Sequence, residues 1–514
     1  MKKIYILPLL ALCLSACVED EGNYKYSDLN EVTIENFESR YSAISQVDRI
    51  QISPEVSSTL YGDDTSDMEF TWSVCLDNLT HEHIVLSHEK DLDWVVDIDP
   101  GSYNLYFTVR SKSEGVEDLF QASLTVSSPL TTGFLVLGDL VADNRCAVDM
   151  IAMPTGRDTM VVEDVYDNSQ LRLQNPEKII FAGYHYSGAE GHRQALWMLA
   201  DNKARRMNSG SSFEDLGEFN DLALVEVDYP VTKPAVMRDM FPHQSVISGR
   251  AQNLSQMYRG YVTDEVVVVA SVMLLEYFTE PSNRYERNSS SPLFKPSPYV
   301  FYRAAYNSAY STCLIYDMDD DCFAYVNYLE YRSIKLKDSE TDPWKFDARS
   351  EGRKLVYGEN TFSNVSYALM TDSEDNYYIY GFTAPTSATG TAAKQALVTV
   401  DKSIATDFDK ASNYMFSATR TSVFYTVGSR LYQYDWGRKM IEHVDFDGEI
   451  TMLKPDYLST GSNYYFLVAT YSDEGEGMIY KMERSDDPNS LTMTNLLKWP
   501  TRLKVKDMEW KNAN

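Results

Sequence analysis

Short stretches in which apolar and polar residues alternate follow one another from residue 31 to residue 128. In the clearest of them, residues 103–109, tyrosine, leucine, phenylalanine and valine occupy every second position. Because successive side chains of a strand point to opposite faces, this alternation predicts a strand with one buried face. A region of this length, rich in short strands and with Trp72 in one of them, is typical of an immunoglobulin-like β-sandwich.

Pairs of apolar strands recur from residue 133 onward at intervals of roughly 50 residues, which is the range of propeller blades. Examples are residues 133–138 with 146–151 and residues 422–427 with 430–435. Seven such units predict an all-β chain with a β-propeller of about seven blades over residues 130–514. Residues 503–510 would complete the first or last blade. Tandem β-sandwiches are the alternative, whereas the lack of long helical periodicity disfavours an α/β enzyme core.

The chain begins with the charged-then-apolar order of a secretory signal. Two lysines precede an apolar run over residues 4–14, which is shorter than the roughly 20 residues that span a bilayer. Residues 14–17, Leu-Ser-Ala-Cys, resemble the lipobox of bacterial lipoproteins. The resemblance implies a signal peptide over residues 1–16 and a lipid on Cys17. An ordinary signal peptide that contains a cysteine is the alternative.

Residues 17–30 are polar and aperiodic, which predicts a flexible tether. Glu19, Asp20 and Glu21 resemble the surface-export signal that one phylum of gut Gram-negative bacteria places on lipoproteins. The resemblance implies an outer-membrane protein that faces the cell exterior. A solvated acidic tether would have the same composition and is the alternative.

Two strands carry a second resemblance. Residues 70–74 and 100–109 look like the tryptophan strand and the glycine-x-tyrosine strand of PKD (polycystic kidney disease) domains, although Cys75-Leu76-Asp77 replaces the usual glycine-aspartate-glycine. With the lipobox and tether, the pattern is similar to PKD-like lipoproteins of starch-utilisation-type outer-membrane uptake systems. This resemblance implies a PKD-like domain over residues 31–128, a propeller after it, and a transporter–lipoprotein assembly or a glycan as partner.

Charge excludes some partners. The chain carries a formal net charge of −30, and loss of residues 1–16 with their two lysines would make it −32. Because a polyanion would be repelled, nucleic acid and anionic lipid headgroups are poor partners. We therefore expect membrane attachment through the N-terminal lipid only.

Six cysteines are present, of which Cys13 would leave with the signal and Cys17 would carry lipid. Four thiols are too few to hold together a chain of this length, so the cores must stabilise it. Cys313 and Cys322 flank an apparent strand–turn–strand at residues 314–321. Equal spacing from the turn predicts that the two cysteines face each other as a candidate disulfide.

Motifs for catalysis and metal binding are incomplete. His81-Glu82-His83 begins like a zinc-protease helix, but Val85 stands where the second histidine is needed. Residues 317–321 and 445–449 imitate calcium loops, and both are interpreted as acidic turns. We therefore predict no metal, no cofactor and no catalytic residue, with calcium binding left unsupported. A propeller glycoside hydrolase or lyase that uses paired carboxylates is the leading enzyme alternative.

Aromatic residues are abundant, with 37 tyrosines, 21 phenylalanines and seven tryptophans. Flat aromatic faces stack on sugar rings, and tyrosine adds a hydroxyl group for hydrogen bonding. The candidate binding aromatics are Tyr299, Tyr302, Tyr325 and Tyr328, and ordinary strand packing is their alternative role. The sequence thus predicts a non-enzymatic, surface-exposed binding or scaffolding protein.

Overall fold

The computed structural model describes the chain from residue 30 to residue 512 with several gaps. The described residues are 30–76, 82–166, 171–187, 191–208, 213–222, 236–241, 243, 245–247, 250–252, 258–271, 278–288, 290–303, 313–327, 330–385 and 392–512. The expected signal peptide, Cys17 and most of the tether lie outside them. The chain divides into two compact units, Met1–Ser128 and Pro129–Asn514. Within the described residues, no helix is long and apolar enough to cross a membrane.

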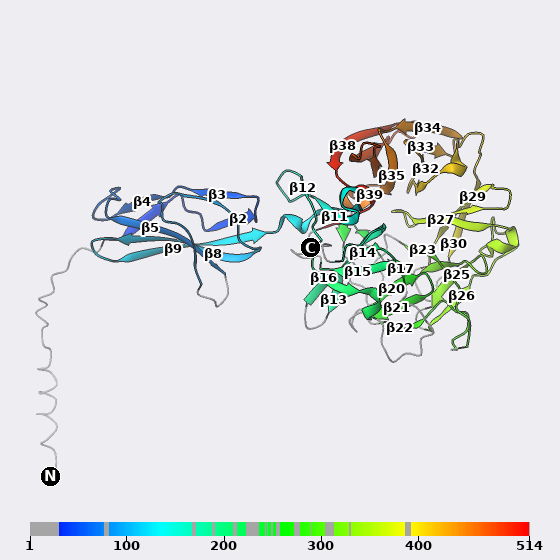
Figure 1. The fold of residues 1–514 in the computed structure, drawn as a ribbon, viewed down its shortest axis with the longest axis horizontal. Coiled ribbons are helices and arrows are strands. Elements are labelled where there is room, and N and C mark those ends of the chain that lie inside the picture. Colours follow the sequence, from blue (N-terminus) through cyan, green and yellow to red (C-terminus); the bar gives the residue numbers. More distant parts are fainter. Residues whose placement is uncertain are drawn as a thin grey trace, which may run out of the picture. The chain divides into compact units, whose positions relative to one another are not determined.

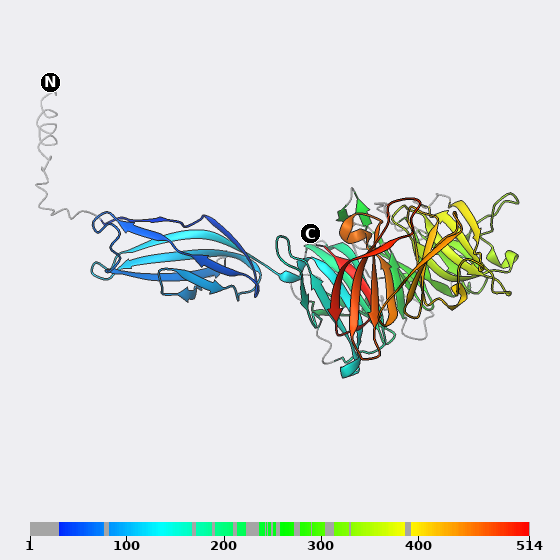
Figure 2. The same cartoon turned by 90° about the horizontal axis from the view of Figure 1, so that it is seen from above.

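The N-terminal unit is a small β-sandwich (Figures 1 and 2). Its main sheet has the order β2-β9-β8-β5-β6, and two strand pairs, β1-β4 and β3-β7, complete it. β2 runs parallel to β9, whereas the other neighbours are antiparallel. The strands are β1 (Val32–Glu35), β2 (Arg40–Ile44), β3 (Arg49–Ile52), β4 (Glu55–Ser58), β5 (Met68–Leu76), β6 (Ile84–Ser87), β7 (Leu92–Val95), β8 (Gly101–Ser111) and β9 (Glu117–Ser127).

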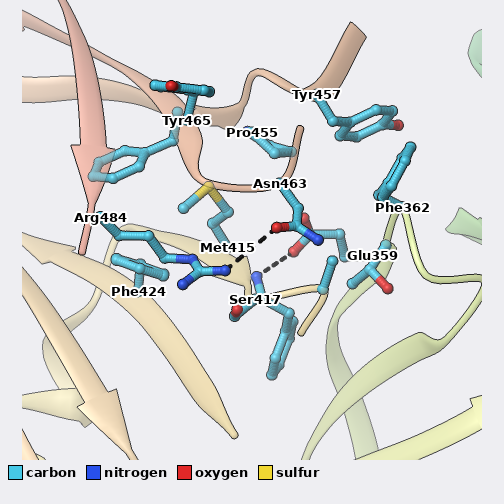
Figure 3. Close-up of a pocket in the computed structure, with 14 residues that line it drawn as sticks. Glu359, Phe362, Met415, Ser417, Phe424, Pro455, Tyr457, Asn463, Tyr465 and Arg484 are labelled. Atoms are coloured by element: carbon cyan, nitrogen blue, oxygen red, sulfur yellow. Dashed lines mark hydrogen bonds between the residues drawn. The ribbon is translucent and has the colours of Figure 1, made fainter. Parts of the chain in front are cut away.

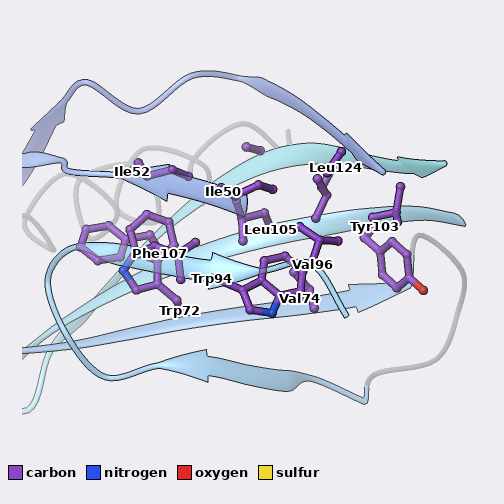
Figure 4. Packing of buried hydrophobic residues seen from close by; sticks show 14 of the residues in the cluster. Ile50, Ile52, Trp72, Val74, Trp94, Val96, Tyr103, Leu105, Phe107 and Leu124 are labelled. Atoms are coloured by element: carbon purple, nitrogen blue, oxygen red, sulfur yellow. The ribbon is translucent and has the colours of Figure 1, made fainter. Parts of the chain in front are cut away.

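One apolar cluster, which includes Trp72, fills this sandwich (Figure 4). Trp72 is fully buried, its ring centroid lies 4.3 Å from that of Phe107, and its Nε1–H donates to the carbonyl of Lys90 at 3.1 Å. The alternation predicted for residues 103–109 is confirmed, because every second side chain from Tyr103 to Val109 is buried. The other side chains of this stretch are only partly covered.

The second unit contains seven four-stranded antiparallel sheets among the residues described (Figures 1 and 2). We call the sheets blades and number them 1 to 7 in chain order. Blade 1 takes its inner strand from the end of the chain, whereas the strands of each other blade follow one another along the chain. Blades 1 to 3 are β39-β10-β11-β12 (Lys504–Lys511, Gly133–Leu140, Arg145–Ala152, Met160–Val162), β13 to β16 (Pro176–Ser187, Gly191–Ala200, Lys203–Met207, Asp215–Glu218) and β17-β20-β21-β22 (Met237–Phe241, Tyr258–Thr263, Val267–Ser271, Phe278–Pro281).

Blades 4 to 7 follow the same plan with their strands in chain order. Blade 4 is β23 to β26 (Pro296–Phe301, Leu314–Asp317, Cys322–Asn327, Arg332–Lys335), and blade 5 is β27 to β30 (Lys354–Asn360, Ser366–Thr371, Tyr377–Thr383, Ala393–Thr399). Blade 6 is β31 to β34 (Asn413–Phe416, Ser422–Val427, Arg430–Asp435, Met440–Asp445), and blade 7 is β35 to β38 (Glu449–Pro455, Tyr465–Tyr471, Gly477–Arg484, Met493–Thr501).

Few other elements interrupt this pattern. A short hairpin, β18 (Ser245–Ile247) and β19 (Arg250–Gln252), is inserted between the first two strands of blade 3, and the one-turn helix α2 (Tyr457–Thr460) lies between the first two strands of blade 7. Among the described residues, the 3-10 turns are η1 (Pro129–Thr131), η2 (Val141–Asp143), η3 (Phe219–Leu222), η5 (Ala348–Glu351) and η6 (Phe408–Lys410).

The packing shows that the seven sheets form a closed ring. Each apolar cluster of this unit combines side chains from two consecutive blades, and the last one joins Phe134 of blade 1 to Leu467 and Ile479 of blade 7. β39 closes the ring by pairing with β10, with Phe134 opposite Trp510. The seven-bladed propeller is therefore confirmed, and the alternative of tandem sandwiches is wrong, because such sandwiches would not share cores around a ring.

The predicted disulfide between Cys313 and Cys322 is wrong, since both thiols are free and buried. The hairpin turns about two residues later than equal spacing assumes, because it is Asp317, and not Cys313, that lies opposite Cys322. The Cys313 carbonyl accepts instead from the backbone N–H of Val326 at 3.1 Å. The two cysteines are thus offset by about four positions along the hairpin.

Candidate functional site

Seven inner strands surround the propeller axis: β39, β13, β17, β23, β27, β31 and β35. At one end of this channel, α2 contacts the hairpin of β18 and β19, although the two elements belong to blades 7 and 3. We call this the capped end. The connections between the first and second strands of the blades lie there, and several of them bring polar side chains to the axis.

Asp239, at the middle of β17, lies between two bases. Its carboxylate is 2.9 Å from Nζ of Lys178 on β13 and 2.8 Å from Nε2 of His243, which follows β17. Burial alone would raise the pKa of Asp239, but Lys178 and His243 outweigh it and hold this pKa well below its ordinary value. The backbone N–H of His243 donates to the hydroxyl of Tyr302 at 3.3 Å. Blades 2, 3 and 4 therefore share one ionic cluster.

Lys454, on β35, holds a second cluster together. Its Nζ lies 3.1 Å from Asp507 and 2.9 Å from Glu509, which share one face of β39. Asp507 also accepts from the backbone N–H of Ile179 at 3.0 Å. Burial alone would lower the pKa of Lys454, but the two carboxylates raise it above its ordinary value. Burial raises the pKa of Glu509 in spite of the neighbouring ammonium.

The two clusters are electrostatically connected. His243 lowers the pKa of Glu509, although less than burial raises it. Burial raises the pKa of Tyr302 well above its ordinary value, and Tyr457 of α2, Asp239 and Glu509 add to this shift. The capped end therefore joins acids, bases and phenols from at least five blades.

The predicted binding aromatics fall in different places. Tyr302 lies at the capped end, and Tyr299 on β23 stacks edge-on against Tyr357 of β27 at 5.4 Å. Tyr325 is 4% exposed and packs in the core between blades 4 and 5, so its prediction as a binding residue is wrong. Its position on a central strand, β25, explains the burial. Tyr328 lies outside the described residues.

A pocket opens beside the channel between blades 5, 6 and 7 (Figure 3). Glu359 of β27 enters it from one side and Arg484 of β37 from the other, with Asn463 between the strands of blade 7. Aromatic and small polar residues complete the walls: Phe362, Phe416, Ser417, Phe424, Tyr457 and Tyr465. Tyr457 belongs both to this pocket and to the axial clusters.

Burial perturbs both charged groups of the pocket. It raises the pKa of Glu359 to about 8, although the N–H of Phe416 donates to this carboxyl group at 2.7 Å and the hydroxyl of Tyr357 at 3.4 Å. Burial and the nearby Arg420 lower the pKa of Arg484 to about 10. Glu359 is therefore protonated at neutral pH, while Arg484 stays charged.

Candidate metal motifs do not converge. His83 hydrogen-bonds with Ser73 and His88 with Thr71, each at 3.2 Å, and His81 lies outside the described residues. Asp317 accepts from the backbone N–H groups of Asp319 and Asp320, as expected of an acidic turn. In the part of the chain that the structure describes, no group of three or more His, Cys, Asp or Glu side chains is arranged to hold a metal ion.

Comparison with known proteins identifies the first part of the chain. Residues 17–171, which include the whole sandwich and the start of the propeller, match the PKD-like family. The N-terminal region is PKD-like. No similar sequence was found among curated proteins.

Several solved structures resemble the chain at low identity. A quinoprotein alcohol dehydrogenase-like protein from Bacteroides thetaiotaomicron is 12% identical, with 95% of this chain and 100% of that chain covered and a TM-score of 0.38. The extracellular domain of a protein described as a hybrid two-component system from the same species is 8% identical (92% and 68% covered, TM-score 0.33). The WD40 domain of SCAP from fission yeast is also 8% identical (71% and 90% covered, TM-score 0.28). We assign the propeller from its own sheet topology.

Sequence reasoning missed most residues of the capped end. Asp239, His243, Glu359, Lys454 and Arg484 belong to no motif, because they come from different blades and meet only when the ring closes. One signal was available. Asp507 and Glu509 alternate with apolar residues on the predicted last strand, so they point to the same side as each other.

Proposed function

We propose that this protein is a surface-exposed lipoprotein, anchored through Cys17, whose propeller binds a nutrient for a starch-utilisation-type outer-membrane uptake system without transforming it. The PKD-like sandwich would serve as a spacer. The capped end of the propeller would hold the ligand, with a glycan as the first choice because half-buried aromatic residues, Phe362, Tyr457 and Tyr465, surround its pocket.

One observation carries this proposal: the acids at the axis are already engaged. Asp239 is paired with Lys178 and His243, and Asp507 and Glu509 share the ammonium group of Lys454. In glycoside hydrolysis, one carboxyl group must donate a proton and the other must attack or activate water. Carboxylates that are paired with a lysine are poorly suited to act as the proton donor and the nucleophile or base. Their pairing therefore supports binding over the hydrolase or lyase alternative.

The proposal is tested by electrophoresis of the full chain in gels that each contain one polysaccharide, with an assay for newly released reducing ends. We expect at least one polysaccharide to retard the protein and none to be cleaved. Tyr457→Ala should abolish the retardation, because it removes the ring shared by the pocket and the axial clusters. Tyr61→Ala, at a 49% exposed position of the sandwich, is the matched control.

Two results would overturn the proposal. Release of reducing ends would make the protein an enzyme. Absence of retardation by every polysaccharide, together with co-purification of transporter subunits, would favour a scaffolding role instead.

A further inference from the structure

Arg484 lines the pocket and Arg420 lies near it, and neither has an acidic ion-pair partner among the described residues. The chain has 76 acidic and 46 basic residues, so carboxylates outnumber the basic groups that could pair with them. After burial, the like charge of Arg420 is the next largest cause that lowers the pKa of Arg484, which places the two guanidinium groups near each other.

The acceptors around both guanidinium groups are neutral. Arg484 donates from Nη2 to the Thr419 hydroxyl at 2.7 Å and to Asn463 Oδ1 at 3.4 Å, and from Nη1 to the carbonyl of Ser485 at 3.3 Å. Its Nε finds no acceptor, although the residue is only 3% exposed. Arg420 donates to the carbonyls of Ser490 and Asp487 at 2.8 and 2.7 Å.

A buried guanidinium group without a counter-charge is costly, so such a group is seldom retained for stability alone. Its planar fork of N–H donors matches the two oxygens of a carboxylate. The nearby carboxyl group of Asp486 has a favourable electrostatic effect on Arg484, but no ion pair joins them. Arg484 is thus available for an incoming anion.

Glu359, on the side of the pocket opposite Arg484, also suits a carboxylate ligand. Glu359 is protonated at neutral pH, so its O–H can donate to a carboxylate where an ionised glutamate would repel it. The space left for a small group is about 20 Å³, little more than one water molecule needs. No sugar ring fits in this space, so a sugar ligand would lie outside it and reach in with one small substituent.

The rest of the ligand would lie against aromatic side chains. The half-buried rings of Phe362 and Tyr457 line the pocket across from Arg484, with their centroids 5.7 Å apart (Figure 3). Flat aromatic rings bind the C–H faces of sugars. This feature favours a carboxylated sugar over the end of a peptide.

We propose that the pocket binds the carboxylate of a uronic acid residue in an acidic glycan, with Arg484 as its ion-pair partner and Phe362 and Tyr457 beneath the sugar. The inference rests on the proposed function and deepens it by naming the class of glycan. The overall negative charge of the chain would disfavour long polyuronates, so a short chain or a sparsely charged glycan fits better.

The test is isothermal titration calorimetry of the full chain with four probes: a galacturonate trisaccharide, its methyl ester, a neutral maltotriose, and a tripeptide with a free C-terminus. We expect the galacturonate to bind at least tenfold more tightly than its ester, because esterification removes the charge that Arg484 needs. This comparison uses the unmodified protein and does not depend on the folding of a variant. Equal affinity for acid and ester would overturn the inference.

A second arm assigns the binding to the pocket. Arg484→Gln should lower galacturonate affinity at least tenfold and leave the ester unchanged, whereas Arg430→Gln, at a surface arginine paired with Asp445, should change neither. An unchanged affinity in Arg484→Gln would place the acid elsewhere and overturn the inference. Binding of the peptide alone would overturn the sugar assignment. Binding of maltotriose without galacturonate would overturn the inference but leave glycan capture intact, while binding of no glycan would contradict both.

Discussion

The two units bury different kinds of residue. Among the described residues up to Ser128, the buried polar side chains are all serines. The propeller buries charged groups as well, including Asp149, Asp239, Arg259, Arg284, Asp317, Asp435, Asp456, Arg484, Asp507, Glu509 and Lys511. The sandwich therefore gains stability from apolar packing, whereas the propeller pays a desolvation cost for its charges.

The difference in buried charged groups indicates that the two units have different roles. Replacing buried ion pairs with apolar residues is often neutral or stabilising, so a fold that needs only stability has little use for them. The apolar sandwich suits a spacer. The charged capped end and the arginine pocket suit the unit that recognises a ligand.

The largest effect is expected from Trp72→Ala. Loss of this fully buried ring should lower the free energy of unfolding of the sandwich by about 3–5 kcal/mol. Urea unfolding followed by circular dichroism should show one early transition from the sandwich and an unchanged one from the propeller. Leu119→Ala, at a 61% exposed position, is the control and should change the stability by less than about 0.5 kcal/mol. A shift of the propeller transition would contradict the independence of the two units.

A smaller effect is expected from Lys454→Met, which leaves Asp507 and Glu509 without their shared cation. Breaking a buried ion pair by removing one partner typically costs about 3 kcal/mol, so the propeller transition should move to lower urea concentration. Lys504→Met, on the strand β39 that also carries Asp507 and Glu509, removes a surface contact to Glu449 at 3.4 Å and should have little effect. Equal stabilities of the two variants would show that the ion pairs of Lys454 with Asp507 and Glu509 do not stabilise the propeller.

The third effect concerns pH. Burial raises the pKa of Glu359 to about 8 in the folded state, so the folded propeller retains this proton where the unfolded chain has lost it. Its contribution is fully present below about pH 4.5 and is lost as the pH rises to about 8. Glu359→Gln should therefore lose less stability than the unmodified protein between pH 5 and pH 8 in urea unfolding. Identical losses in both proteins would mean that Glu359 titrates normally.

Periodicity made most of the fold predictable. The alternation around Phe107 and the regular hairpins of the second unit depend on local sequence, and both predicted the observed strands. The offset of Cys313 from Cys322 was not predictable in the same way. It depends on where the acidic residues 318–321 turn, and composition does not specify that register.

The site was much less predictable than the fold. The clustering of aromatic residues selected Tyr302, which lies at the capped end, but the same criterion selected Tyr325, which is part of the core. Arg484 gave no signal, since an arginine at the end of a strand is usually exposed. Its burial results from packing between blades 6 and 7, and no local pattern encodes that contact.

The pairing of β39 with β10 has a consequence for biogenesis. The strand that seals blade 1 is made after every other blade, so until then Val136 and its neighbours present an unpaired backbone edge that Met508 will later cover. Such an edge invites association with other chains during the slow assembly of distant strands. A ribosome that stops before β39 would thus release a molecule with six complete blades and an unpaired edge of β10. We expect protein quality control to act on chains that expose this edge.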